Sequence, residues 1–151
     1  MMILKWLFIV ITNLLLLSSC NIDSKELPDL IIPTPEEGKS SVAGQIANKS
    51  GESLANTTVR LAEVYRDDLD TQKGAFLLDT AFSPGAITNE QGVFIIASLP
   101  SGEYVLVVGD VESNNYVIIS DDSGEAQTWN LPQNESLNLG KIIVDFDFGN
   151  N

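Results

Sequence analysis

The sequence predicts an all-β domain, either a β-sandwich or a barrel, on two observations. From Ser40 onward, almost every apolar segment alternates with polar residues at a period of two and ends at Gly, Pro, Asn or Asp. No amphipathic helical pattern of useful length interrupts these segments. Short strands with evenly spaced turns are typical of sandwiches and barrels. We expect eight strands, over residues 42–47, 58–65, 75–82, 92–97, 103–108, 116–120, 127–131 and 139–148.

The first 20 residues have the layout of an export signal. Lys5 precedes an apolar run over residues 6–17, and "LSSC" follows, ending at Cys20. The run is shorter than the about 20 residues that a spanning helix needs, so a cleaved signal peptide over residues 1–19 is favoured. The residues before Cys20 resemble a bacterial lipobox, which implies lipid, such as palmitate, on this cysteine. The alternative is an ordinary signal peptide with a chance cysteine at its end.

A lipid on Cys20 would make this a lipoprotein of the cell envelope, exported from the cytoplasm and held on a membrane. Because asparagine follows Cys20, the leader resembles those of lipoproteins sent to the outer membrane in Gram-negative cells. Residues 20–39 contain Pro28, Pro33 and Pro35 and predict an extended linker that reaches roughly 60 Å. Docking of the apolar residues 30–32 on the domain would shorten that reach.

Charge and composition exclude several classes of function. The formal net charge of −13 repels phosphate backbones, so we expect no nucleic-acid partner. The chain contains no histidine, which removes Ser-His-Asp and Cys-His nucleophile systems and imidazole metal sites. Only carboxylate chemistry then remains open to an enzyme. We expect no enzyme activity, no catalytic residue, no metal site and no cofactor. The expected partners are the membrane, through Cys20, and an envelope protein or glycan.

The stretch "TNEQGVFIIASLPSGEYVLVV", residues 88–108, predicts a hairpin that turns at "LPSG". It resembles the signature hairpin of carboxypeptidase regulatory-like domains, T-D-x-x-G-x-F-x-I followed by L-P-x-G-x-Y-x-L-x-V. Asn89 stands where aspartate is usual. The residues at matching positions are Thr88, Gly92, Phe94, Ile96, Leu99, Pro100, Gly102, Tyr104, Leu106 and Val108. Further matches lie upstream and downstream, at Val42, Gly44, Ile46, Gly51, Leu54, Val59, Leu61, Leu139, Gly140 and Ile142.

This resemblance implies a transthyretin-like fold for residues 40–151, a single antiparallel Greek-key β-sandwich of seven to eight strands. It also implies a non-catalytic accessory or binding module whose motif residues serve packing. The segment 63–86 is longer than in the minimal module. We therefore expect a non-catalytic, lipid-anchored envelope protein whose sandwich binds or scaffolds other molecules. A carbohydrate-binding module on the same fold is the alternative.

The other face of the expected hairpin carries four apolar residues where a one-sided sheet would be polar. We interpret them as an interaction face, covered by residues 30–32, by the long segment 63–86 or by a partner. The four residues are Val93, Ile95, Val105 and Val107.

Three further patterns in the sequence each have a simpler structural explanation. "LLDTAF" places Asp79 as in an aspartic protease, but Ala81 replaces the glycine and no second motif occurs, which favours a plain strand-end aspartate. Calcium would need oxygen ligands from acidic clusters, yet none has the spacing of a calcium loop, which favours solvated turns. Those clusters contain Asp67, Asp68, Asp70, Asp121, Asp122, Glu125, Asp145 and Asp147. The aromatic residues Tyr65, Tyr116 and Trp129 would suit a sugar platform, although core positions are more typical.

Overall fold

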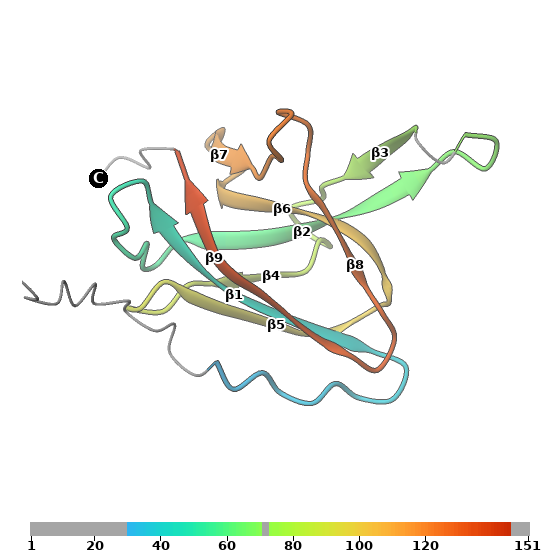
Figure 1. The fold of residues 1–151 in the computed structure, drawn as a ribbon, viewed down its shortest axis with the longest axis horizontal. Helices are drawn as coiled ribbons and strands as arrows, with labels where there is room; N and C mark the ends of the chain where they lie inside the picture. Colours follow the sequence, from blue (N-terminus) through green and yellow to red (C-terminus); the bar gives the residue numbers. More distant parts are fainter. Residues whose placement is uncertain (1–29, 71–72, 146–151) are drawn as a thin grey trace, which may run out of the picture.

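The computed structural model describes residues 30–70 and 73–145, which form two β-sheets around a shared core (Figure 1). The signal peptide, Cys20 and Asp147 lie outside the described residues. One sheet has three strands in the order β5-β1-β9, and the other has six, in the order β3-β2-β6-β7 with β4 on β2 and β8 on β6. The strands are β1 (Ser40–Asn48), β2 (Thr58–Arg66), β3 (Gly74–Leu77), β4 (Gly85–Ile87), β5 (Val93–Leu99), β6 (Gly102–Asp110), β7 (Asn115–Ile118), β8 (Thr128–Leu131) and β9 (Ser136–Val144).

The all-β prediction is confirmed for the described residues. Each of the eight expected strands has a counterpart, and the short β4 is an addition. The expectation of a purely antiparallel sandwich needs one correction, because β9 pairs with β1 in parallel. β9 follows β8, a strand of the six-stranded sheet, so it enters the other sheet by a crossover and not by a hairpin. The described segments contain no helix long and apolar enough to cross a membrane.

The expected hairpin over residues 88–108 is wrong, because its two strands belong to different sheets. β5 pairs with β1, whereas β6 pairs with β2, β7 and β8. The register of β1 and β5 shifts near Ser98, which has a left-handed φ of 58°. A β-bulge bends the strand that carries it. "LPSG" therefore carries the chain from one sheet to the other across the end of the core (Figure 1).

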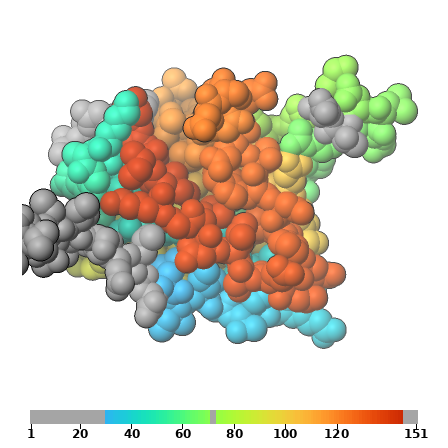
Figure 2. Space-filling view, in the orientation of Figure 1, coloured from blue at the N-terminus to red at the C-terminus, as the bar shows by residue number. Residues whose placement is uncertain are grey.

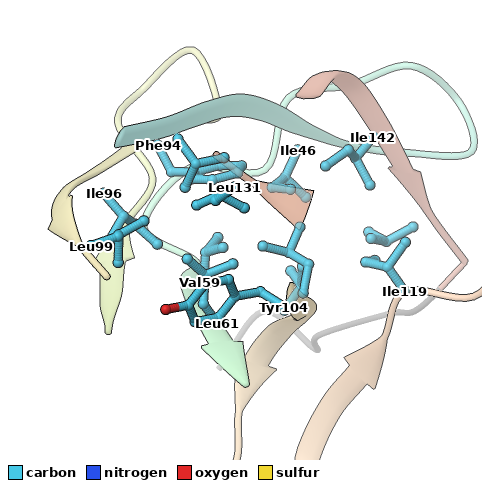
Figure 3. Close-up of a cluster of buried hydrophobic side chains, with 14 residues drawn as sticks. Ile46, Val59, Leu61, Phe94, Ile96, Leu99, Tyr104, Ile119, Leu131 and Ile142 are labelled. Carbon is cyan, nitrogen blue, oxygen red and sulfur yellow. The ribbon is translucent and has the colours of Figure 1, made fainter. Parts of the chain in front are cut away.

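The core faces predicted for β5 and β6 are confirmed. Side chains from both sheets point toward one another in the main cluster, where Phe94 is 1% and Leu106 0% exposed (Figure 3). Along β9, Leu137 and Leu139 lie two residues apart, but the next apolar residue, Ile142, follows after three residues, and Val144 follows two residues later. All four pack in the core or against it. A bulge at Gly140, whose φ is 70°, accounts for the added residue.

The four residues expected to form an interaction face do not share one. Val93 and Ile95 lie on β5, and only Ile95 is exposed, at 38%. Val105 and Val107 lie on β6 in the other sheet, are at most 1% exposed, and form a second cluster with Ala62. The side chains packed against this second cluster come from the same chain: Val64, Leu78, Val111, Tyr116, Ile118 and Ala126. The long segment 63–86 thus contributes part of the cover, through Val64 and Leu78.

The residues of the "TNEQG" motif support the backbone. The Thr88 hydroxyl donates to the Leu54 carbonyl at 2.6 Å and accepts the Thr57 amide at 2.9 Å. The Asn89 side-chain oxygen accepts the amides of Gln91 and Val93 at 3.0 and 2.9 Å. An amide oxygen fills this acceptor role as a carboxylate would. Asn89 therefore holds this turn through its side-chain oxygen.

The linker follows the domain surface from residue 30 onward. The Ser136 hydroxyl donates to the Pro33 carbonyl at 3.2 Å, and the Gly38 amide donates to the Asn134 side-chain oxygen at 2.6 Å. Leu30 and Ile32 are half-buried, while Ile31 is exposed. This docking removes residues 30–39 from the free length of the expected tether.

Candidate binding groove

The end of β2 and the whole of β3 form a hairpin that projects from the domain (Figures 1 and 2). We call residues 63–66 of β2 and 74–77 of β3 the arm. Glu63 pairs with Leu77 and Tyr65 with Ala75 across it. All four residues of β3 are exposed. Alternate residues of a strand point to opposite faces. One face of the arm therefore continues the core side of the six-stranded sheet, and the other face continues its outer side.

A groove with a volume of about 330 Å³ lies along the core side of the arm. The groove forms where the six-stranded sheet extends past the buried core. Leu61 and Tyr104 are buried at its base. Its wall along the arm consists of Glu63, Tyr65 and Leu77. The turn after β3 and the crossover between β5 and β6 complete the lining. These two segments contribute Asp79, Phe82, Ser83, Pro84 and Pro100.

Three large apolar side chains in the groove are open to solvent. Tyr65 is 54%, Leu77 58% and Phe82 85% exposed. Isolated exposed apolar residues are common, but three around one concave site mark a candidate binding surface. The Tyr65 hydroxyl donates to Glu63 Oε2 at 2.8 Å, which restricts the ring to one side of the arm. The base of the groove is held similarly, since the Tyr104 hydroxyl donates to the Pro100 carbonyl at 3.0 Å.

Phe82 lies on a turn that hydrogen bonds hold in place. Asp79 Oδ1 accepts the amides of Ala81 and Phe82 at 2.8 and 3.2 Å, and the Asp79 amide donates to Ser83 Oγ at 2.8 Å. The turn is attached to β2 by the Leu61 amide, which donates to the Pro84 carbonyl at 2.9 Å. The exposed Phe82 ring is therefore carried on an ordered segment. Asp79 serves as the cap of this turn, in agreement with the simpler interpretation of "LLDTAF".

The groove is acidic and rich in hydrogen-bond acceptors. Among the described residues, the charged side chains that line it are Glu63 and Asp79. The hydrogen bond to Glu63 raises the pKa of Tyr65, and burial raises the pKa of Tyr104. Both phenols therefore stay protonated and neutral at ordinary pH. Each carboxylate offers about four lone-pair sites, so both can accept further bonds from a ligand. The site can hold a ligand that combines an apolar surface with hydrogen-bond donors.

The sequence-predicted aromatic platform is not assembled. Trp129 packs against the main core, and Tyr116 packs with the second cluster on the other side of the sheet. Of the three expected aromatics, Tyr65 alone is among the exposed large apolar residues of the described part. The structure adds Phe82 and Leu77, which sequence reasoning missed. The signal that could have located them is the length of the segment 63–86.

The acidic clusters over residues 67–70 and 121–125 lie in the connections between β2 and β3 and between β7 and β8. Within residues 30–70 and 73–145, no group of three or more carboxylate or cysteine side chains converges to hold a metal ion. Asp121 Oδ1 accepts bonds from Ser123 and Glu125, and the Ser123 side chain lowers the Asp121 pKa. Asp67 accepts the Leu69 amide, and Asp145 pairs with Lys49. These bonds fit the interpretation of the clusters as solvated turns.

A second hollow, of about 840 Å³, lies on the outer side of the arm. Val64 and Phe76 of the arm and Val105 of β6 contribute its apolar surface. Arg66 crosses the sheet to form a two-pronged ion pair with Glu103. That pair lowers the pKa of the Glu103 carboxyl. The lining of this hollow is mixed in charge, and its large apolar side chains are less exposed than Tyr65, Leu77 and Phe82. The groove is therefore the stronger candidate site.

Comparison with known proteins gives no family. No protein-family model and no curated protein matches the chain. A solved 9R-lipoxygenase from Cyanothece PCC8801 is 15% identical, with a TM-score of 0.38 over 82% of this chain and 19% of the lipoxygenase. A candidate carbohydrate-binding protein from Pseudomonas aeruginosa is 17% identical, with a TM-score of 0.38 over 76% of this chain and 99% of that protein. At these scores, neither neighbour carries an argument about this chain.

Proposed function

We propose that this protein is a non-catalytic, lipid-anchored component of the cell envelope that binds its partner in the groove beside the arm. One observation carries the proposal: Tyr65, Leu77 and Phe82 are exposed around one concave site whose walls are fixed by hydrogen bonds. Small-ligand sites are concave and mostly apolar, with a few polar groups that orient the ligand. The lipid on Cys20 and the envelope location belong to this proposal.

The proposal includes a carboxypeptidase regulatory-like domain over residues 40–151, with the Greek-key arrangement of that family. The backbone roles of Thr88, Asn89 and Gly92 support it, because a packing motif is what the resemblance implies. A non-catalytic role is supported by Asp79, which caps a turn, and by a sequence without histidine. A carbohydrate-binding module remains the second candidate, and the size and charge of the groove favour it.

Site-specific photo-crosslinking in intact cells tests the proposal. A photoreactive residue at Phe82 should crosslink to an envelope component, because position 82 borders the groove. The same residue at Glu112, exposed in the turn after β6, should give no such product. Equal products from both positions, or none from either, would remove the groove as the binding site. Cys20→Ala should release the protein from the membrane fraction, and retention there would contradict the lipid anchor.

A further inference from the structure

The size of the groove points to a small ligand unit. Its volume of about 330 Å³ lies at the lower end of the range for small-molecule sites, about 300–1,000 Å³. A stable protein partner would instead need about 800 Å² from this side of the interface. The three exposed apolar residues of the groove lie within one hollow and do not extend as a flat patch. A single ring, or one unit of a chain that runs past the arm, is the occupant that fits.

The charges of the groove restrict the chemistry of that unit. Glu63 and Asp79 are its charged lining residues within the described part, and the chain as a whole carries −13. Anionic ligands, such as phosphates or uronic acids, would be repelled and would meet no cation in this lining. Carboxylate oxygens instead accept hydrogen bonds, and a hydroxyl donor to a charged acceptor forms a strong one. These charges argue against an anionic ligand, and the carboxylates suit a ligand that carries several hydrogen-bond donors, such as hydroxyl groups.

The aromatic residues add a requirement for an apolar face. The Tyr65 ring has its hydroxyl engaged by Glu63, which leaves the ring itself as the contact surface. Phe82 adds a second ring on an ordered turn, and Pro84 and Pro100 add further apolar surface. A pyranose ring has an apolar C–H face and hydroxyl groups around its edge, so it satisfies both requirements.

We propose that the groove binds a sugar unit of a neutral saccharide chain, with Tyr65 and Phe82 against the sugar face and Glu63 and Asp79 accepting its hydroxyl groups. This inference rests on the proposed function, because it names the ligand class of the same groove. The contact is confined to one hollow, so the affinity for a single chain is weak. Several anchored copies on one membrane would bind a polymer more tightly than a single copy does.

Titration calorimetry tests the saccharide class with the purified full-length protein in detergent. The neutral probes are cellohexaose, maltohexaose and chitohexaose, and the anionic probe is oligogalacturonate of the same length. Binding of at least one neutral probe, and about tenfold weaker or no binding of the anionic one, is the expected result. Preferred binding of the anionic probe would overturn the proposal. So would the absence of heat from every neutral probe at millimolar concentration.

Variants assign the binding to the groove. Tyr65→Ala and Phe82→Ala should each weaken binding at least about tenfold, whereas Tyr65→Phe, which keeps the ring, should stay within about threefold of wild type. The matched control is Ile143→Ala, since Ile143 is similarly exposed, at 50%, but lies on β9 in the other sheet. All three substituted side chains are exposed, so thermal unfolding should show that each of the four variants folds. An equal change of saccharide affinity in all these variants, Ile143→Ala included, would overturn the assignment of binding to the groove.

The two experiments separate the two proposals. Crosslinks from position 82 to a protein, together with no binding of any neutral saccharide, would end the saccharide inference and leave the groove as a protein-binding site. Crosslinks from neither position 82 nor position 112, together with saccharide binding that Tyr65→Ala does not affect, would end both proposals.

Discussion

Replacing Gly92 by alanine tests whether the backbone of the "TNEQG" turn touches β1 as closely as the structure shows. Gly92 has a φ of 73°, and its carbonyl accepts the Ile46 amide at 2.8 Å. A Cβ at this position would collide with the Ile46 carbonyl oxygen and lie 3.1 Å from the Ser53 Cβ. The Ile46 oxygen already accepts the Leu54 amide at 3.0 Å, so moving it would disturb a second hydrogen bond.

The expected cost is the sum of three effects. A left-handed φ costs an L-residue about 1 kcal/mol, and the stiffer unfolded chain returns about half of that. Backbone displacement in a packed site costs about 1–3 kcal/mol. Weakening of the hydrogen bond to Ile46 adds about 1 kcal/mol. Gly92→Ala should therefore lower the free energy of unfolding by about 3 kcal/mol.

Gly124→Ala is the matched control. Gly124 has a φ of 85°, but a Cβ there would meet nothing within 4 Å, so backbone strain alone remains and the cost is about 1 kcal/mol or less. The difference of about 2 kcal/mol separates the urea midpoints of the two variants by about 1 M at an m-value of about 2 kcal/mol/M. Equal midpoints at equal m-values would show that Gly92 does not lie against β1.

Three further substitutions test local features of the fold by the same urea titration. Asn89→Asp should raise the midpoint slightly, because a carboxylate accepts the two amides more strongly, whereas Asn89→Ala should cost about 1 kcal/mol. Ser98→Gly should stabilise by about 0.5 kcal/mol, since glycine adopts the left-handed φ without strain; destabilisation would mean that the bulge is absent. Glu103→Gln should cost up to about 1 kcal/mol at pH 7 and progressively less as the pH falls below 4.5. Arg66 holds the Glu103 pKa below its ordinary value of 4.5, so the contribution of the pair is present above that value and is lost as the pH falls through the lowered pKa; a loss independent of pH would contradict this.

The sequence predicted the faces of the strands better than their partners. A period of two assigns each side chain to one of two faces, and the burial of Phe94, Tyr104 and Leu106 confirms that assignment. The pattern contains no information on which strand lies alongside. The bulge at Ser98 decides that β5 stays with β1 while β6 crosses to β2, and serine has no strong preference for the left-handed region. The short turn between β5 and β6 therefore predicts that these two strands pair with each other, but they pair with different strands.

The candidate groove was less predictable than the fold. The sequence predicts Tyr65 as one of three platform aromatics, but the other two, Tyr116 and Trp129, pack elsewhere. Phe82 reaches the groove through a turn capped by Asp79, and this capping depends on hydrogen bonds that no sequence period reports. The groove also needs Pro100, which arrives through the crossover between the sheets. A predicted hairpin over residues 88–108 does not place Pro100 beside the arm.

The exposed apolar side chains of the groove lie outside the family-like motifs, whereas the motif residues Leu61, Pro100 and Tyr104 form part of its base and wall. This division supports the proposed binding module. Gly44 and Phe94, which belong to two motifs, face each other in the register of β1 and β5. A Cβ on Gly44 would lie 2.9 Å from Phe94 Cε1, so the small residue and the ring form one packing unit. Residues committed to such contacts are not available to a ligand. Tyr65 and Phe82 lie instead in the long segment 63–86, where they can change with little effect on the core. Specificity in this protein should therefore reside in the arm and its turn, while the motif residues maintain the sheets that position them.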